Sequence, residues 1–228
     1  MTKKRAWLRP PINDISLSII TDPLPIGKYK ITEEEDKRNK HVERIKSSVT
    51  NMTLILNDFL SAGKLEEGKI NINLVSIKLP SYINESINEL SNFLKNGQKV
   101  IYNHTGNENF VCDKQFLKNI IINLVSNSSK FSAQSKTIEL STINKGTELK
   151  IIIKDEGIGI PKDEQKNLFE RFFRAKNATN IQGTGLGLSI VAKYIEILNG
   201  TITFESALNK GTQFYITIPA HNENNIIN

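Results

Sequence analysis

The amino-acid sequence predicts an α+β chain in which an α-helical hairpin precedes an α/β sandwich, a mixed sheet covered by helices on one face. Two observations predict this fold class. Before residue 68, apolar side chains recur at helical spacing along one long segment. After residue 68, short segments that alternate like strands are interspersed with helical ones. Because that later order mixes strand pairs with helices, the sheet is expected to be mixed and its helices to share one side.

The first 32 residues are interrupted by proline. Four of the seven prolines of the chain lie here, namely Pro10, Pro11, Pro23 and Pro25. Proline disfavours a long unbroken helix, both at its own position and at the one before it. The segment therefore favours a short helix over residues 12–20 followed by a loop.

A long amphipathic helix is predicted over residues 33–62. Its apolar residues recur every three or four positions with Lys and Glu between them, and they are Val42, Ile45, Val49, Met52, Ile55 or Leu56, and Phe59. A stripe this narrow favours pairing with a second helix, so we expect a helical hairpin that dimerises into a four-helix bundle. A single helix lying on the following domain is the alternative.

A domain boundary is expected near residue 68, because Gly63 and Gly68 punctuate the end of this helix. The predicted domains are the helical hairpin over residues 1–68, an α/β domain over residues 69–221 and a polar tail over residues 222–228. Within the second domain, strands are predicted at 70–74, 100–103, 110–112, 138–143, 149–154, 201–205 and 212–219, and helices at 82–94, 114–130 and 186–198.

Composition and charge limit the classes of function. The hydrophobic fraction of 38% and the charged fraction of 24% are ordinary for a globular protein. The formal net charge is +6, yet Lys and Arg are scattered among acids, so no nucleic-acid partner is expected. The single cysteine, Cys112, cannot form an internal disulfide, and no apolar run approaches the roughly 20 residues of a membrane helix. We expect a cytoplasmic protein, or the cytoplasmic part of a membrane-anchored one.

The helix predicted over residues 114–130 carries polar residues on one face. Asn119, Asn123, Asn127 and Lys130 are spaced by four, four and three positions, which places them on the same side. Amide oxygens are hard ligands that suit Mg²⁺ beside phosphate oxygens, and a lysine one turn further on would meet phosphate as a point charge. The alternative is a polar face exposed to solvent.

An aspartate, Asp155, directly follows the predicted strand 149–154 and precedes Gly157 and Gly159. A carboxylate at a strand end can accept a hydrogen bond from an exocyclic amine such as that of adenine. The glycines let a ring approach the backbone. Taken alone, the turn is a weak signal, since many turns contain these residues.

A second glycine turn covers residues 183–187 and is expected to open a helix. The free N-terminal amides of such a helix attract phosphate oxygens. Before this turn lies a polar segment, residues 175–182, that suits a mobile lid. A cluster predicted to be helical precedes the segment, and it contains Leu168, Phe169, Phe172 and Phe173, followed by Arg174.

Together, the order and spacing of these motifs resemble the catalytic ATP-binding domain of bacterial sensor histidine kinases of two-component systems. In chain order the motifs are Asn123…Asn127…Lys130, Asp155-x-Gly157-x-Gly159, Phe169…Phe172-Phe173-Arg174, Gly183-Thr184-Gly185-Leu186-Gly187-Leu188 and Gly211-Thr212-x-Phe214. The resemblance covers residues from about 70 to 220. It implies the Bergerat-type ATP-binding sandwich of the GHKL superfamily, which is shared with gyrase-type topoisomerases, heat-shock chaperones and mismatch-repair ATPases.

The resemblance also implies roles for individual residues. Asn127 would hold Mg²⁺, Asn123 would contact phosphates, and Asp155 would bind the adenine amine with the support of Thr212. The catalytic residues would be Lys130 at the phosphates and Arg174, which would reach the γ-phosphate during transfer. The full set implied to bind ATP is Asn123, Asn127, Lys130, Phe131, Asp155, Gly157, Gly159, Arg174, Gly183, Thr184, Gly185, Leu186, Gly187, Leu188 and Thr212.

By the same resemblance, the chain is expected to be the cytoplasmic core of a sensor histidine kinase, an ATP-dependent phosphotransferase with ATP and Mg²⁺ as cofactors. Residues 1–68 would form its dimerisation and phosphoacceptor-like hairpin, and residues 69–221 its catalytic domain. The run from Lys64 to Lys69 resembles the usual link between the two. The implied partners are a second copy of the chain, bound through the hairpin, and the receiver domain of a response regulator.

The histidine that this family phosphorylates has no counterpart here. The family motif is close to His-Glu-x-Arg-Thr-Pro-Leu, and Ala6 stands at the acceptor position of the nearest match, Ala6-Trp7-Leu8-Arg9-Pro10-Pro11-Ile12. Trp7 replaces the acidic neighbour. The histidines of the chain are His41, predicted on the surface of the long helix, His104 in a loop and His221 in the tail. No phosphoacceptor is found, so self-phosphorylation is doubtful.

Three accounts of this difference stay open. The acceptor segment is substituted, or the protein is a natural kinase-like one that binds ATP without phosphorylating itself, or another chain supplies the acceptor. Two alternative functions also follow. One is a non-catalytic scaffold that dimerises and binds a response regulator. The other is a different ATPase of the same superfamily, which is disfavoured because a hairpin precedes the domain and no transducer domain follows it.

Overall fold

The computed structural model describes residues 72–220 continuously. Before them it describes single helical positions at Arg38, His41, Val42, Ile45, Val49, Met52, Leu56 and Gly63. The chain divides into two units, Met1–Lys46 and Ser47–Asn228, and the architecture below is that of residues 72–220 within the second. The pairing of helices in a hairpin, the boundary near residue 68, Ala6 and the tail 222–228 lie outside the described residues, and these features stay predictions.

Helices and strands alternate along residues 72–220 much as their sequence patterns predict. In chain order the elements are β1 (Leu74–Lys78), α3 (Leu79–Glu89), the 3₁₀ turn η1 (Ser91–Phe93), β2 (Lys99–Gly106), β3 (Asn109–Asp113), α4 (Lys114–Phe131), β4 (Thr137–Asn144), β5 (Glu148–Lys154), the 3₁₀ turns η2 (Gln165–Asn167) and η3 (Lys176–Ala178), α5 (Gly187–Ile197), β6 (Thr201–Ser206) and β7 (Thr212–Pro219).

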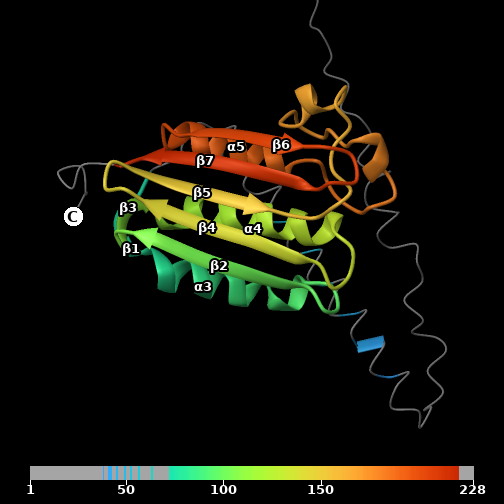
Figure 1. Cartoon of the computed structure of the whole chain (residues 1–228), viewed down its shortest axis with the longest axis horizontal. Coiled ribbons are helices and arrows are strands. Elements are labelled where there is room, and N and C mark those ends of the chain that lie inside the picture. Colours follow the sequence, from blue (N-terminus) through green and yellow to red (C-terminus); the bar gives the residue numbers. More distant parts are fainter. Residues whose placement is uncertain are drawn as a thin grey trace, which may run out of the picture. The chain divides into compact units, whose positions relative to one another are not determined.

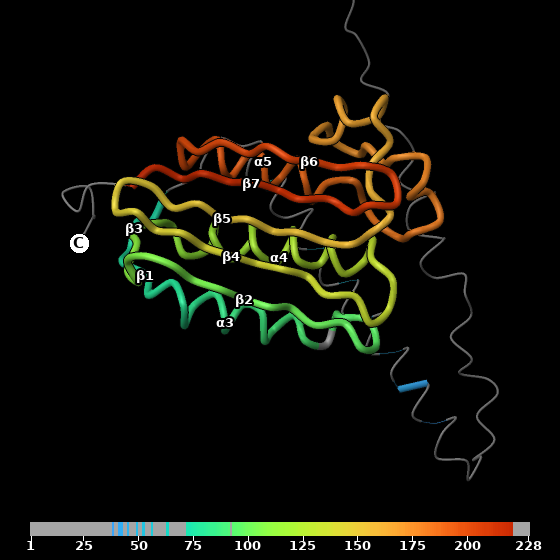
Figure 2. The backbone as a smooth tube through the Cα atoms, in the orientation of Figure 1, coloured from blue at the N-terminus to red at the C-terminus, as the bar shows by residue number. Residues whose placement is uncertain are grey.

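Five strands form one mixed sheet in the order β2-β4-β5-β7-β6, and β1 pairs with β3 in a small separate sheet. Helices α3, α4 and α5 lie on one face of the large sheet and leave the other face open (Figure 1). Strands β2 and β4 run parallel, and Figure 2 traces how they lie side by side although β3 and α4 separate them in the chain. The other neighbours pair antiparallel. The predicted mixed sheet with helices on one face is confirmed.

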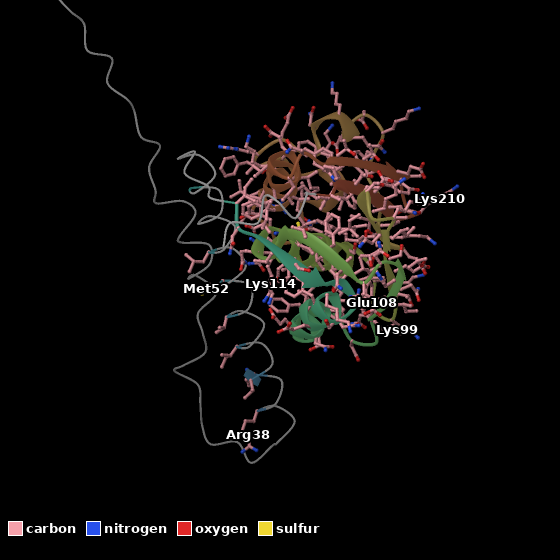
Figure 3. The ribbon with its side chains drawn as sticks, turned by 90° about the vertical axis from the view of Figure 1, so that its left-hand side faces the viewer. Arg38, Met52, Lys99, Glu108, Lys114 and Lys210 are labelled. Carbon is pink, nitrogen blue, oxygen red and sulfur yellow. The ribbon has the colours of Figure 1, made fainter. Side chains whose placement is uncertain are left out.

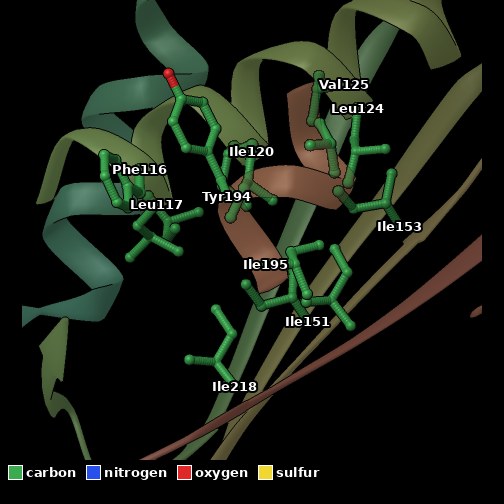
Figure 4. Packing of buried hydrophobic residues seen from close by; sticks show 14 of the residues in the cluster. Phe116, Leu117, Ile120, Leu124, Val125, Ile151, Ile153, Tyr194, Ile195 and Ile218 are labelled. Atoms are coloured by element: carbon green, nitrogen blue, oxygen red, sulfur yellow. The ribbon is translucent and has the colours of Figure 1, made fainter. Parts of the chain in front are cut away.

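The hydrophobic core lies between this sheet and its helices. On α4 the residues that are spaced to share one face are buried, and they include Phe116, Leu117, Ile120, Leu124 and Val125. Figure 4 shows them beside Tyr194 and Ile195 of α5 and Ile151 and Ile153 of β5. The rings of Phe116 and Tyr194 stack with their centroids 4.6 Å apart. Since burying one such side chain stabilises the fold by about 1.5–3 kcal/mol, this face fixes the rotation of α4 about its axis.

Asp113 fixes the beginning of α4. Its Oδ1 accepts hydrogen bonds from the backbone N–H groups of Gln115 and Phe116, both at 2.9 Å. These bonds satisfy donors that the first turn of a helix leaves unpaired. Its Oδ2 accepts the N–H of Asn73 at 2.8 Å. The same carboxylate therefore ties the entry of the domain to the helix that carries the amide residues.

Two predicted boundaries near the start of the domain are wrong. The strand predicted over residues 70–74 begins only at Leu74, and Ile72 and Asn73 are irregular. The helix predicted from residue 82 begins at Leu79 because Pro80 occupies its first turn, where proline is tolerated. This helix ends at Glu89 and is followed by η1 rather than continuing to residue 94.

The helix predicted around residues 168–173 is also wrong. The 3₁₀ turn η2 ends at Asn167, and Phe172 takes a left-handed φ of 62°. The backbone N–H of Phe172 donates to the carbonyl of Gly185 at 3.0 Å, so its bond goes to the second glycine turn and not to a preceding helical carbonyl. Phe169 still packs in the core, with its ring centroid 5.8 Å from that of Phe204.

The apolar stripe that precedes the domain is exposed at its described positions. Val42, Ile45, Val49, Met52 and Leu56 are helical and between 41% and 59% exposed, and the Met52 side chain is visible in Figure 3. Their spacing of three and four residues is that of a coiled-coil seam. At these described positions the seam is therefore exposed. Among the described residues, no helix is long and apolar enough to cross a membrane.

Candidate nucleotide site

A cavity of about 400 Å³ opens beside α4 and collects residues from segments far apart in the sequence. Its lining comes from α4, from the turn after β5, from the stretch between η2 and α5, and from the start of β7. All of the predicted ATP-binding residues except Gly157 and Leu186 line it, namely Asn123, Asn127, Lys130, Phe131, Asp155, Gly159, Arg174, Gly183, Thr184, Gly185, Gly187, Leu188 and Thr212.

Asp155 forms the most buried charged part of this lining, with 6% of its surface exposed. Its Oδ1 accepts the backbone N–H groups of Gly157 at 2.9 Å and Thr212 at 3.1 Å. Its Oδ2 accepts the hydroxyl of Ser128 at 3.2 Å. An ionised carboxylate offers about four acceptor sites, so Asp155 retains capacity for a donor on a ligand.

The protonation of Asp155 depends on two opposed influences. Burial raises the pKa of the Asp155 carboxyl above its ordinary value because a low-dielectric environment disfavours the charged form. Hydrogen bonds from Gly157, Thr212 and Ser128 lower that pKa. Any further donor from a ligand would also favour the ionised form, so binding of an amine and ionisation of Asp155 would reinforce each other.

The glycines of the turns allow backbone segments to meet at the cavity. Gly211 has a φ of 86°, and a Cβ there would overlap the carbonyl oxygen of Asp155. Gly159 has a φ of 63°, and its Cβ would overlap the carbonyl of Ala207. Although Gly157 does not line the cavity, a Cβ on it would lie 2.8 Å from both Asp155 Oδ1 and the carbonyl oxygen of Phe131.

The polar face of α4 meets the second glycine turn. Asn123 donates from Nδ2 to the carbonyl of Asn119 at 3.0 Å, and its Oδ1 lies 2.7 Å from where a Cβ on Gly187 would stand. The Lys130 ammonium lies beside Gly183 and 5.1 Å from the ring centroid of Phe131. This arrangement places the amides of Asn123 and Asn127 and the ammonium group of Lys130 along one wall of the cavity.

Asn119 differs from the other amides of this face. Its side chain does not line the cavity. Instead, its Nδ2 lies 3.2 Å from the hydroxyl of Tyr194 on α5. Helical spacing alone grouped Asn119 with Asn123 and Asn127, yet only the latter two reach the cavity.

The segment over residues 175–182, predicted to be a lid, borders the cavity and is held by hydrogen bonds at residues 176, 177 and 178. Asn177 donates from Nδ2 to the carbonyl of Gly159 at 2.9 Å. The backbone N–H of Lys176 donates to the buried carboxylate of Glu164, also at 2.9 Å. Arg174 Nη2 lies 3.0 Å from the carbonyl oxygen of Ala178. In this structure the arginine predicted to meet the γ-phosphate holds the backbone of the lid.

Several residues of the cavity were missed by sequence analysis. Ser128 stands next to Asn127, and its position one turn after the apolar Leu124 could have marked it as buried. Lys95 reaches the cavity from the loop before β2, and no motif marks it. Of the apolar lining residues, Leu168, Phe173 and Phe214 belong to the predicted cluster and motifs, whereas Ile158 and Ile160 were not singled out.

Of the histidines, His104 lies in β2 and not in a loop as predicted. Its Nδ1 is 2.8 Å from the hydroxyl of Thr142, and its Nε2 is 3.1 Å from the carbonyl oxygen of Asn107. His41 lies on the helix before the domain and is partly exposed. His221 lies outside the described residues.

A cation in this cavity would depend on oxygen ligands other than carboxylates. Within residues 72–220 and the eight helical positions before them, no group of three or more His, Cys, Asp or Glu side chains could hold a metal ion. The amide of Asn127 lines the cavity. An amide oxygen joined by phosphate oxygens and waters is a ligand set that Mg²⁺ accepts. The residues present therefore fit a magnesium ion that arrives with a nucleotide.

Comparison with known proteins defines the class. Residues 112–222 match the family described as histidine kinase-, DNA gyrase B-, and HSP90-like ATPases. The signal transduction histidine-protein kinase BarA of Escherichia coli K12 is 32% identical, over 96% of this chain and 24% of its own length. The circadian input-output histidine kinase CikA of Synechococcus elongatus is 28% identical, over 81% of this chain and 25% of its own. The chain thus spans about a quarter of these relatives.

Solved structures agree on the fold. A nucleotide-free catalytic domain of the histidine kinase ThkA is 26% identical with a TM-score of 0.54, over 65% of this chain and 98% of that one. The mycobacterial sensor histidine kinase MprB is 23% identical with a TM-score of 0.56, over 64% of this chain and 97% of that one. The prediction of a GHKL-type ATPase domain similar to those of sensor histidine kinases is confirmed.

Proposed function

We propose that this domain binds Mg-ATP and acts as the phosphoryl-donor site of a sensor histidine kinase. One observation carries the proposal. The cavity joins a buried carboxylate, Asp155, to a wall formed by Asn123, Asn127 and Lys130. The carboxylate suits an exocyclic amine, while the amides and the ammonium group suit phosphates and their cation.

At the adenine end, Asp155 would accept a hydrogen bond from the amine of the base. Thr212 supports this role because its N–H donates to Asp155 Oδ1 at 3.1 Å. The apolar side chains of Ile160, Leu168 and Phe214 also line the cavity and would bury the faces of the ring. Gly159, which carries no side chain to obstruct the ring, would lie against its edge.

At the phosphate end, Asn127 would give its amide oxygen to Mg²⁺, and Asn123 and Lys130 would contact phosphates. Bound Mg²⁺ would neutralise charge on the β- and γ-phosphates during transfer. The turn over residues 183–187 leads into α5, whose first N–H groups have no helical partner and would donate to phosphate oxygens.

Transfer would require Arg174 to change partners. Its guanidinium now lies within hydrogen-bonding distance of carbonyls of the lid, and it would have to turn from these to the γ-phosphate. Since Ala6 stands where the acceptor histidine is expected, we propose that the phosphoryl group passes to a histidine of another chain or is not transferred. In the second case the protein is a dimerising, kinase-like scaffold for a response regulator.

The wider setting is proposed on the same grounds. The exposed seam from Val42 to Leu56 would dimerise two copies through their hairpins. A receiver domain of a response regulator would be the downstream partner. The protein would act in the cytoplasm, on its own or as part of a membrane-anchored sensor.

Nucleotide selectivity tests the adenine end. A fluorescent ATP analogue bound to the full chain should be displaced by ATP and by ADP but not by GTP at the same concentration. Guanine presents a carbonyl oxygen where adenine presents its amine, and that oxygen would face the carboxylate of Asp155. Displacement by GTP as readily as by ATP, or no displacement by ATP, would contradict the proposal.

Labelling tests the transfer step. Incubation of the isolated chain with ATP labelled at the γ-phosphate should leave no acid-labile label on it. A histidine-containing hairpin from a related kinase serves as the positive control for the assay. Acid-labile label on the isolated chain would show that one of its own histidines accepts the phosphoryl group, and the proposed lack of self-phosphorylation would then be wrong.

A further inference from the structure

The C-terminal end of α4 is held by residues far away in the sequence. A helix leaves its last four carbonyl groups without helical partners, and in α4 these belong to Ser128, Ser129, Lys130 and Phe131. The carbonyl of Ser128 accepts the N–H of Ser132 at 3.1 Å, and that of Phe131 accepts the N–H of Ile158, also at 3.1 Å. The other two are satisfied from the loop between η1 and β2.

Lys95 and Gln98 supply these two bonds. The Lys95 ammonium donates to the carbonyl of Lys130 at 2.7 Å and to that of Ser132 at the same distance. Gln98 is buried and donates from Nε2 to the carbonyl of Ser129 at 3.0 Å. Its Oε1 accepts the backbone N–H of Lys95 at 2.9 Å, so the glutamine also holds the backbone that carries the lysine.

The C-terminal end of α4 differs from the usual ending of a helix. Helices commonly end at a glycine that pairs the last carbonyls locally, whereas this one uses an ammonium group 35 positions away. Although Lys95 is largely exposed, partial burial lowers the pKa of its ammonium group because a partly covered charge loses some of its hydration. Lys95 also lines the cavity. An ending that is made by a distant lysine at the border of the cavity points to a role of this lysine in the site.

We infer that Lys95 is a positioning residue for nucleotide binding, which acts by fixing the backbone of Lys130 at the wall of the cavity. Phe131 has a separate tie through Ile158, so the loss of Lys95 would release Lys130 in particular. Lys130 is the residue proposed to meet the phosphates. The inference rests on the proposed function, and it adds a residue that no motif of the site contains.

The test compares ATP with adenosine, because only ATP reaches Lys130. With Lys95→Met in the full chain, ATP affinity should fall by about tenfold, the size expected when a charge-assisted hydrogen bond is lost. Adenosine affinity should change by less than about twofold, because adenosine has no phosphate to reach Lys130. Lys95→Arg should restore ATP binding because a guanidinium can donate to the same carbonyls. Lys99→Met is the matched control, since Lys99 is exposed at the start of β2 (Figure 3).

A double-mutant cycle decides whether Lys95 acts through Lys130. In a Lys130→Met background, Lys95→Met should have no further effect on ATP affinity. A full effect in that background would mean that Lys95 meets phosphate itself, and equal losses of ATP and adenosine would mean a general structural role. Either result overturns the inference, as does an unchanged ATP affinity in Lys95→Met. An unmutated chain that binds no ATP would instead overturn the proposed function and the inference with it.

Discussion

Asp155 joins three parts of the site through one carboxylate. It follows β5 directly, accepts a hydrogen bond from Ser128 of α4, and exchanges bonds with the backbone of Thr212 at the start of β7. These donors favour the ionised form of the carboxyl and so oppose the burial that raises its pKa; they support a negative charge in a buried place. That charge is what the proposed recognition of adenine uses.

Replacing Asp155 with asparagine tests its role. The asparagine oxygen can still accept the N–H groups of Gly157 and Thr212, so the fold should persist. The charge and one acceptor are lost, and ATP affinity should fall by about tenfold to a hundredfold. Titration calorimetry measures the change, with Glu156→Gln as the control because Glu156 is the exposed neighbouring carboxylate. Equal affinity in Asp155→Asn and the unmutated chain would exclude the proposed contact.

The same residue predicts a dependence of stability on pH. Because the pKa of Asp155 is raised in the folded state, the folded chain binds this proton more tightly than the unfolded chain does. Its contribution to the free energy of unfolding is therefore fully present below the ordinary Asp pKa of about 3.9 and is lost as pH rises through the folded pKa.

Denaturation by urea at a series of pH values measures this dependence. Relative to the unmutated chain, Asp155→Asn should gain stability as pH rises from about 4, the ordinary Asp pKa, and the gain should level off above the folded pKa of Asp155. A relative stability that falls over the same range would show that the pKa is lowered in the folded state. The affinity of the unmutated chain for ATP should weaken as pH falls, because protonation of the Asp155 carboxylate removes the acceptor proposed for the adenine amine.

Sequence reasoning reached some residues of the site and not others for a physical reason. Asn123, Asn127 and Asp155 stand in recurring spacings that reflect local chemistry. Ser128 contacts Asp155 across 27 positions of the sequence, and Lys95 contacts Lys130 across 35. The residues next to Ser128 and Lys95 in the sequence form no pattern that predicts these contacts. Such residues become visible only when α4 is packed against the segments around it.

At the scale of elements, the turns depend on glycine for space as well as for dihedral angles. Gly211 has a φ of 86°, and a Cβ would overlap the carbonyl of Asp155. Gly211→Ala should therefore lower the free energy of unfolding by about 1–3 kcal/mol or more. Urea denaturation measures the loss. Gly63→Ala, at a helical position where a Cβ meets nothing within 4 Å, should show none, and equal stability of Gly211→Ala and the unmutated chain would contradict this account.

Periodicity predicted the long elements well and the short ones poorly. The pattern of α4 indicates its range almost to the residue, because one face is buried along its whole length. In contrast, the Phe-rich stretch has helical spacing but forms turns. Phe172 bonds to Gly185 across the glycine turn, and it is 70% exposed. Spacing cannot reveal a bond between two loops, so this part of the site was not predictable.

At the scale of the whole molecule, the exposed seam before the domain predicts an oligomer. The paired change Val49→Glu and Met52→Glu should convert a dimer into a monomer, because charges would be buried without partners at the centre of the seam. Sedimentation equilibrium gives the mass directly. Ser47→Glu, which lies outside the heptad seam in sequence, is the control. An unmutated chain that sediments as a monomer would contradict the prediction.

Binding of Mg-ATP is the central claim, and a calorimetric titration of the full chain with ATP, in the presence and absence of Mg²⁺, tests it most directly. The account predicts one nucleotide per chain, bound more tightly with Mg²⁺. The effect of Mg²⁺ should disappear in Asn127→Ala and persist in Asn119→Ala, whose side chain lies on the same helix outside the cavity. No binding at millimolar ATP, or an equal effect of Mg²⁺ in both variants, would contradict it.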